Sequence, residues 1–133
     1  MLWIWIRCNT SMNKEVFEGG IRMENWKKLD IDGIVDIEKC VAEFNVWELR
    51  KTPWGKFKVK IFENANGNFT GYTNLMLRDE TEDHTPYGGV GHGNDIAGAL
   101  EDTVYYFMKM INERMEKGTL NEEDFEVAES YDF

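Results

Sequence analysis

The sequence has few of the residues that build metal or disulfide sites, and it has no long apolar run. Of its 133 residues only two are cysteines, Cys8 and Cys40, and two are histidines, His84 and His92. Two cysteines are too few for a disulfide-built scaffold, and no Cys/His spacing is typical of zinc. No apolar segment approaches the roughly 20 residues that a membrane helix requires. We therefore predict a cytoplasmic chain that does not span a membrane and holds neither a metal nor a cofactor.

Basic residues are also scarce relative to acidic ones. The chain has 15 Lys and Arg against 25 Asp and Glu, for a net charge of -10. A negative field opposes attraction to nucleic acid and to anionic lipid, so nucleic-acid binding is disfavoured and a basic protein is the easier partner to attract. The alternative is that the acidity serves solubility alone.

The length suits a single domain. The sequence Glu18-Gly19-Gly20 ahead of Met23 is compatible, read back into codons, with a ribosome-binding site before the true start. We predict that residues 1–22 are a non-native leader or a disordered extension, residues 23–118 a single domain and residues 119–133 an acidic tail. A genuine first strand on the opening MLWIWI is the alternative for the leader, and a short strand on FEVAES is the alternative for the tail.

One segment has an unambiguous helical period, and it predicts a helix from about residue 94 to 117. We place Asn94 at its N-cap, Asp95 in its first turn, and Lys117 with Gly118 at its end. The apolar stripe of this helix recurs at steps of three and four and comprises Ile96, Ala99, Leu100, Val104, Phe107, Met108, Ile111 and Met115.

The segments before this helix predict a small antiparallel sheet. A strand over residues 46–52 leads through the turn Thr52-Pro53-Trp54-Gly55 into a second strand, in which Phe57, Val59 and Ile61 face inward and Lys56, Lys58 and Lys60 outward. An Asn-Gly turn at 66–67 leads to a third strand over residues 68–79, with Phe69, Leu75 and Leu77 on one side and Tyr72 and Met76 on the other. Residues 88–93 are a possible fourth strand. Helical spacing of Ile34, Ile37, Val41 and Phe44 predicts a short helix over residues 33–43.

The fold class is therefore α+β, an antiparallel three- to four-stranded sheet packed on one long C-terminal helix, with a short N-terminal helix. The glycines 88, 89, 91 and 93 precede the long helix, but their spacing fits neither common phosphate-binding fingerprint, and we attribute them to the tight turn into the helix. No arrangement of nucleophile, base and acid indicates catalysis, so we predict no catalytic residues and no enzyme activity.

Two charged surfaces are candidate binding sites. An acidic loop and the acidic tail could dock on a basic protein, through Asp79, Glu80, Glu82, Asp83, Glu122, Glu123, Asp124 and Glu126. A basic hairpin could contact RNA or an acidic partner, through Arg50, Lys51, Trp54, Lys56, Lys58 and Lys60. Alternatively, the acids of the first surface serve only solubility, and the lysines of the second keep its strand edge from pairing with other chains. A free sheet edge also allows a homo-oligomer.

The run from Phe57 to Phe107 resembles the HicB-like antitoxin pattern, in which a strand, a glycine-containing turn and further strands lead into one helix packed on the sheet. The matching residues are Gly67 at the turn, Gly89, Gly91 and Gly93 before the helix, and Ala99-Leu100 within it. The resemblance implies an antitoxin-like or phage-type inhibitor that masks a basic partner such as a nuclease. An RNA-binding module on the basic hairpin and a small ligand-binding domain at the glycines are the alternatives.

Overall fold

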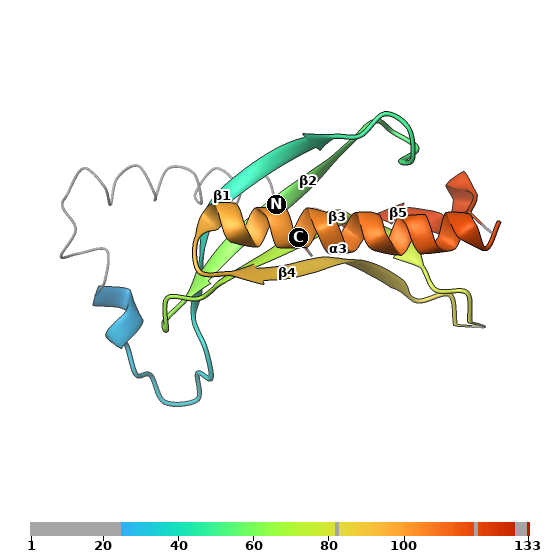
Figure 1. The fold of residues 1–133 in the computed structure, drawn as a ribbon. Helices are drawn as coiled ribbons and strands as arrows, with labels where there is room; N and C mark the ends of the chain where they lie inside the picture. The colour runs from blue at the N-terminus through green and yellow to red at the C-terminus, as the bar shows by residue number, and fades with distance from the viewer. Residues whose placement is uncertain (1–24, 82, 119, 130–132) are drawn as a thin grey trace.

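The computed structural model describes residues 25–81, 83–118, 120–129 and 133, so the predicted leader over residues 1–22 lies outside it. The elements are η1 (Asn25–Lys28), β1 (Glu38–Trp47), β2 (Lys56–Asn64), β3 (Phe69–Arg78), β4 (Pro86–Gly93), α3 (Ile96–Glu116), η2 (Glu122–Asp124) and β5 (Phe125–Val127). All strand pairs are antiparallel, in the order β1-β2-β3-β4, and β5 adds to β3. This arrangement is the predicted α+β fold, with α3 packed on one face of the sheet (Figure 1).

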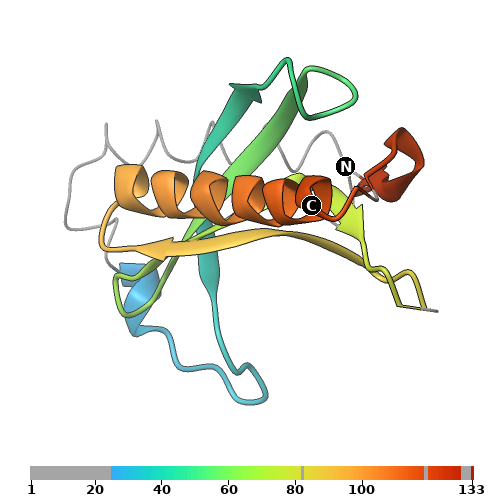
Figure 2. The same ribbon diagram turned by 45° about the vertical axis from the view of Figure 1, so that its right-hand side comes forward.

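The long helix lies closest to β4 and β3, and both views show it running beside β4 (Figure 2). The glycines of β4 make this close packing possible. A Cβ added at Gly91 would overlap the backbone of Asp102 and Thr103, and one added at Gly93 would overlap the backbone of Ala99. These glycines therefore leave room for a helix backbone. The tight turn expected from the sequence is not their main role.

The core lies between the sheet and α3, where Phe57 meets Phe107 edge to face with ring centroids 5.2 Å apart. The inward residues predicted for the second strand are confirmed, and the third strand buries Leu75 and Leu77 as its alternation indicated. The fully buried apolar core comprises Val41, Phe57, Val59, Ile61, Leu75, Leu77, Ala99, Phe107, Ile111 and Phe125. Burial of each Val, Leu, Ile or Phe side chain in this core contributes about 1.5–3 kcal/mol before conformational entropy is subtracted.

The predicted short helix over residues 33–43 is wrong, because residues 38–47 form the edge strand β1. Its register against β2 shifts between Cys40 and Ala42, which leaves Val41 as an extra residue in a bulge. A bulge breaks the two-residue alternation of a strand and allows spacings of three that resemble a helix. The predicted strand over residues 46–52 is likewise wrong beyond Trp47, where the chain enters the hairpin loop.

The long helix is confirmed, but its N-cap and the last residue of its apolar stripe differ from the prediction. The N-cap is Asp95, whose side chain accepts a hydrogen bond from the Gly98 backbone N–H at 2.7 Å, so Asn94 lies before the cap. Met115 is 45% exposed, whereas Arg114 is buried. The predicted end is confirmed, since Gly118 has a φ of 71° and donates to the Met115 carbonyl.

The predicted acidic tail folds back onto the sheet. The part of β2 before Val59 does not pair with β3, and β5 pairs with the part of β3 from Leu75 to Leu77. Asn74 joins β2 to the tail, because its side chain accepts a hydrogen bond from the Lys58 N–H at 2.7 Å and its carbonyl accepts one from the Ala128 N–H at 2.8 Å. The tail is thus held at one end of the molecule, next to the last turns of α3.

Candidate functional site

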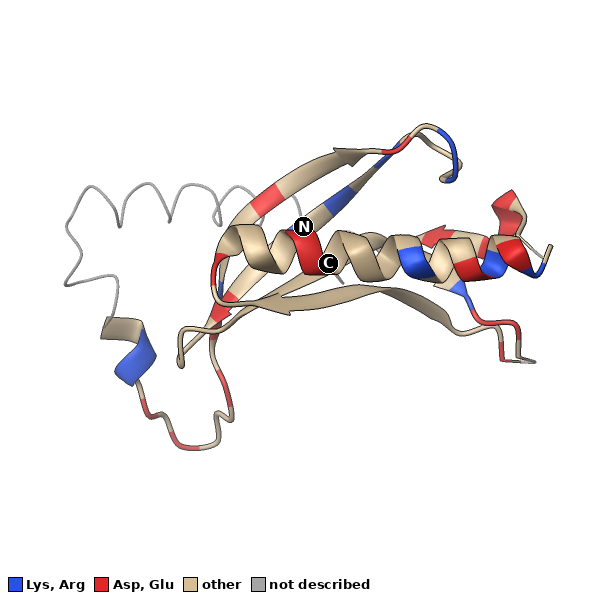
Figure 3. Ribbon diagram, viewed as in Figure 1, with Lys and Arg blue, Asp and Glu red and all other residues tan. Residues whose placement is uncertain are grey.

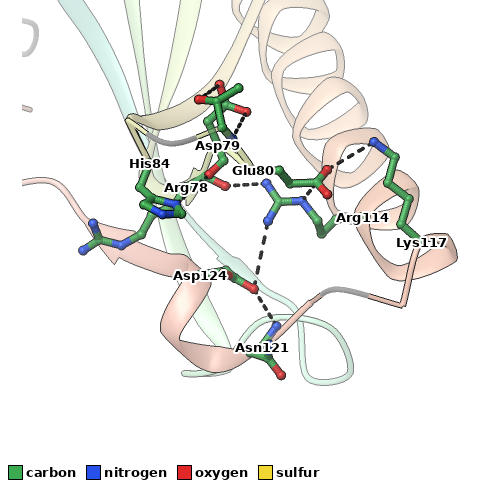
Figure 4. Close-up of polar contacts among 9 residues, drawn as sticks. Arg78, Asp79, Glu80, His84, Arg114, Lys117, Asn121 and Asp124 are labelled. Atoms are coloured by element: carbon green, nitrogen blue, oxygen red, sulfur yellow. Dashed lines mark hydrogen bonds and ion pairs between the residues drawn. The ribbon is translucent and has the colours of Figure 1, made fainter.

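Arg114 joins the acidic loop to the acidic tail (Figure 4). Its guanidinium donates a hydrogen bond to the backbone carbonyl of Arg78, lies 3.3 Å from a Glu80 carboxylate oxygen and lies 4.0 Å from one of Asp124. The Arg114 side chain is only 9% exposed. A buried guanidinium is stable only where acceptors surround it, so it holds the two acidic segments together.

Further contacts fix the loop and the tail individually. Lys117 reaches the same Glu80 oxygen at 3.1 Å. Asp124 accepts a hydrogen bond from the Asn121 N–H at 2.8 Å, within the capping box of η2. Glu126 lies 3.5 Å from Arg78. Three of the carboxylates predicted to bind a partner, Glu80, Asp124 and Glu126, therefore have cationic neighbours within this chain.

The remaining predicted acids point elsewhere. Asp79 accepts hydrogen bonds from the backbone and the hydroxyl of Thr81, which shapes the loop. Asp83, Glu122 and Glu123 are exposed. Glu82 lies outside the described residues. Of the predicted partner-binding acids, the exposed ones lie on both sides of the end of α3, where red segments of loop and tail flank the helix (Figure 3).

We call this region the acidic end, comprising loop residues 79–81 and 83–85, the last two turns of α3 and η2. Between the loop and the helix lies a shallow groove of about 300 Å³, lined in part by Tyr87, Met110 and Glu113. Tyr87 is 53% exposed. An exposed aromatic side chain with charged neighbours is a common feature of protein-binding surfaces.

The basic residues of the predicted hairpin do not form one exposed surface. Lys60 is buried, and its ammonium lies 3.8 Å from Glu43 and 3.2 Å from the carbonyl oxygen of Phe133, so the prediction that it faces outward to solvent is wrong. Lys58 lies 3.5 Å from Glu43, and Lys51 donates to the side-chain oxygen of Asn112 at 2.5 Å.

The other members of this hairpin are accessible. Lys56 lies 5.0 Å from the ring centroid of Trp47, and Arg50 and Trp54 are exposed. Glu48 organises the loop, because one of its oxygens accepts the backbone N–H groups of Arg50, Lys51 and Thr52. Burial alone would raise the pKa of Glu48, but these hydrogen bonds outweigh it and lower that pKa.

A second hollow, which sequence reasoning missed, lies on the sheet face opposite α3. We call it the outer-face cavity. Its volume is about 590 Å³, and its apolar lining includes Phe62, Tyr72, Met76 and Val90. Phe62 and Tyr72 meet edge to face at 5.8 Å. The alternation of the third strand placed Tyr72 and Met76 on one face, but nothing local indicated that a hollow lies above them.

The outer-face cavity has carboxylates in its lining. Glu38, Glu126 and Glu129 contribute to it, and its described lining contains no lysine or arginine. Burial, and then the negative charge of Glu38, raise the pKa of Tyr72 above its usual value. Tyr72 therefore keeps its hydroxyl proton at neutral pH.

Within the described part of the chain, no group of three or more His, Cys, Asp or Glu side chains could hold a metal ion. None of the described helices combines the length and apolarity needed to cross a bilayer. Comparison with family models, with curated proteins and with solved structures gives no match.

Proposed function

We propose that this chain is a non-enzymatic protein-binding module that masks a basic surface of a partner, in the manner of an antitoxin or inhibitor of a nuclease. The observation that carries the proposal is the convergence at Arg114. One buried arginine gathers two acidic segments, far apart in the sequence, at one end of α3. Asp83, Glu122 and Glu123, which this arginine does not contact, are exposed, and the groove between the loop and α3 contains the exposed Tyr87.

The physical consequence is an electrostatically focused surface. Acids on one face attract a cationic protein over roughly one Debye length, about 8 Å at physiological salt, and orient it before contact. Exposed carboxylates at the rim contribute mainly to the association rate. The preordered loop and tail lower the entropy lost on binding, because they are tied down before the partner arrives.

The resemblance to HicB-like antitoxins agrees with a small inhibitor that lacks catalytic groups. The alternative of an RNA-binding hairpin has less support, because Lys60 is buried and Lys58 lies beside Glu43.

Charge neutralisation tests the proposal. The full chain is used as bait in extracts of its source organism, with and without nuclease treatment, and the captured protein is then titrated against purified variants. The triple variant Asp83→Asn, Glu122→Gln and Glu123→Gln removes three exposed charges from the acidic end. The matched control Asp30→Asn, Asp32→Asn and Asp36→Asn removes three exposed charges before β1.

We expect a basic partner whose association rate falls about tenfold or more in the acidic-end variant and falls little in the control. Equal loss in both variants would mean that only net charge matters. Capture of RNA at physiological salt, sensitive to nuclease and to changes at Arg50 and Lys56, would favour the RNA-binding alternative.

A further inference from the structure

The outer-face cavity combines two features that suit an organic cation. Its apolar side is formed by the aromatic pair Phe62 and Tyr72, together with Met76 and Val90. Aromatic faces attract ammonium and guanidinium groups, and a methylene chain packs on apolar surface while its charged end reaches polar groups.

The carboxylates of the cavity supply the complementary charge. Glu38 and Glu129 are exposed residues in its lining, and Glu126 lies there with Arg78 at 3.5 Å. A second cation, the Lys60 ammonium, contacts the lining residue Phe133, 3.2 Å from its carbonyl oxygen and 4.8 Å from the centroid of its ring. Lys60 pairs with Glu43, and within the described part of the chain Glu38 and Glu129 form no ion pair.

The cavity adjoins the acidic end. Its wall includes Val127 and Ala128, which lie in the same tail segment as Asp124, the residue that Arg114 contacts. A volume of about 590 Å³ exceeds what a single side chain fills and suits a short peptide segment.

We propose that the outer-face cavity receives an arginine- or lysine-bearing segment of the basic partner, with the side-chain stem against Tyr72 and Met76 and its charge at the carboxylates. This inference rests on the proposed function and names the anchor of the same partner. The acidic end attracts the partner, and the cavity anchors it. Buried anchors of this kind dominate binding energy, whereas rim charges dominate the encounter.

The test uses the blocked tripeptide Ac-Leu-Arg-Leu-NH2 and its uncharged citrulline counterpart as probes, titrated into the full chain and followed by NMR. We expect saturable shifts of the amides of Tyr72, Met76 and Val90 with the arginine probe, and binding at least about fivefold weaker with citrulline. Equal binding of the two probes, or shifts confined to the acidic end, would overturn the inference.

Variants locate the site. Val90→Lys places an ammonium in the cavity at a position that is 44% exposed and therefore tolerates the change. It should abolish probe binding, as should Glu38→Gln combined with Glu129→Gln. The matched pair Glu122→Gln with Glu123→Gln removes the same charge outside the cavity lining and should leave the probe affinity within about twofold, since distant exposed charges are screened.

The captured partner separates this inference from the proposed function. If Val90→Lys weakens the partner about tenfold or more, mainly through a faster dissociation rate, the cavity is the anchor. If the partner binds Val90→Lys normally but loses affinity for the acidic-end variant, the inference fails and the proposed function stands. If the probe seats in the cavity but the acidic-end variant binds the partner normally, the proposed function fails.

Discussion

Replacing Arg114 with methionine removes the cation that joins the loop and the tail while keeping an apolar stem in its place. The lost interactions are the hydrogen bond to the Arg78 carbonyl and the contacts to Glu80 and Asp124. Removing one partner from a fully buried ion pair costs about 3–5 kcal/mol. Here the carboxylates left behind are 39% and 26% exposed, so water solvates them in part. We therefore expect a loss of about 2 kcal/mol in the free energy of unfolding.

Urea denaturation followed by far-UV circular dichroism measures this loss, and amide exchange locates it. The amides of β5 should exchange faster in the variant, because Asp124 no longer anchors the segment before that strand. The matched control is Lys117→Met, which removes the other cation near Glu80 from a side chain that is 63% exposed. An exposed pair contributes about 0–1 kcal/mol.

If Arg114→Met costs no more than Lys117→Met, the guanidinium does not hold the two segments together and the reasoning is refuted. A double-mutant cycle with Glu80→Gln isolates the pair, and we expect a coupling free energy of about 0.5–2 kcal/mol. No measurable coupling would leave the Arg78 carbonyl as the main acceptor of Arg114.

Three further predictions concern the stability of the fold. Gly91→Ala should lower the melting temperature more than any other alanine substitution in β4, because its Cβ would overlap the backbone at Thr103; an unchanged melting temperature would contradict the close helix packing. Asp95→Ala should destabilise the protein by about 1 kcal/mol in urea denaturation, whereas Asp95→Asn should retain most of the cap; equal losses would contradict the hydrogen bond to Gly98. The depressed pKa of Glu48 in the folded state adds stability that is complete above the ordinary glutamate pKa and disappears as the pH falls through the folded value. Glu48→Gln should therefore be less stable than the wild type at pH 7, and the difference should shrink in acid; a difference independent of pH would contradict the carboxylate's role.

Sequence periodicity correctly predicted the long helix and the second strand, in which apolar residues recur at a regular spacing. The helix stripe holds at Ala99, Phe107 and Ile111, and the second strand buries Phe57, Val59 and Ile61 as predicted, although Lys60 is buried as well. The first strand was misread because its bulge at Val41 interrupts the alternation. A local pattern cannot reveal a bulge, since its position depends on the partner strand.

The candidate site was predictable only as two separate acidic segments. Arg114 lies three residues after Ile111 and seven after Phe107, so its spacing places it on the buried face of the helix. A basic residue in the last turn of a helix is nevertheless expected to face solvent and interact with the helix dipole, so its burial was not predicted. Its inward position follows from acceptors at Glu80 and Asp124, which the sheet pairing of β3 with β5 brings together. The outer-face cavity is equally a product of this pairing, because its wall includes the tail.

The position of Arg114 also separates stability from binding within the acidic end. Carboxylates that contact a largely buried guanidinium are less available to a partner, and their interaction is screened less by salt than that of exposed charges. Asp83, Glu122 and Glu123 are exposed, and under the proposed function they would attract the partner through an interaction that salt screens. Raising the ionic strength should therefore slow partner association steeply while changing the free energy of unfolding little. We therefore expect the partner to bind at Asp83, Glu122 and Glu123, whereas Glu80 and Asp124 mainly stabilise the fold through Arg114.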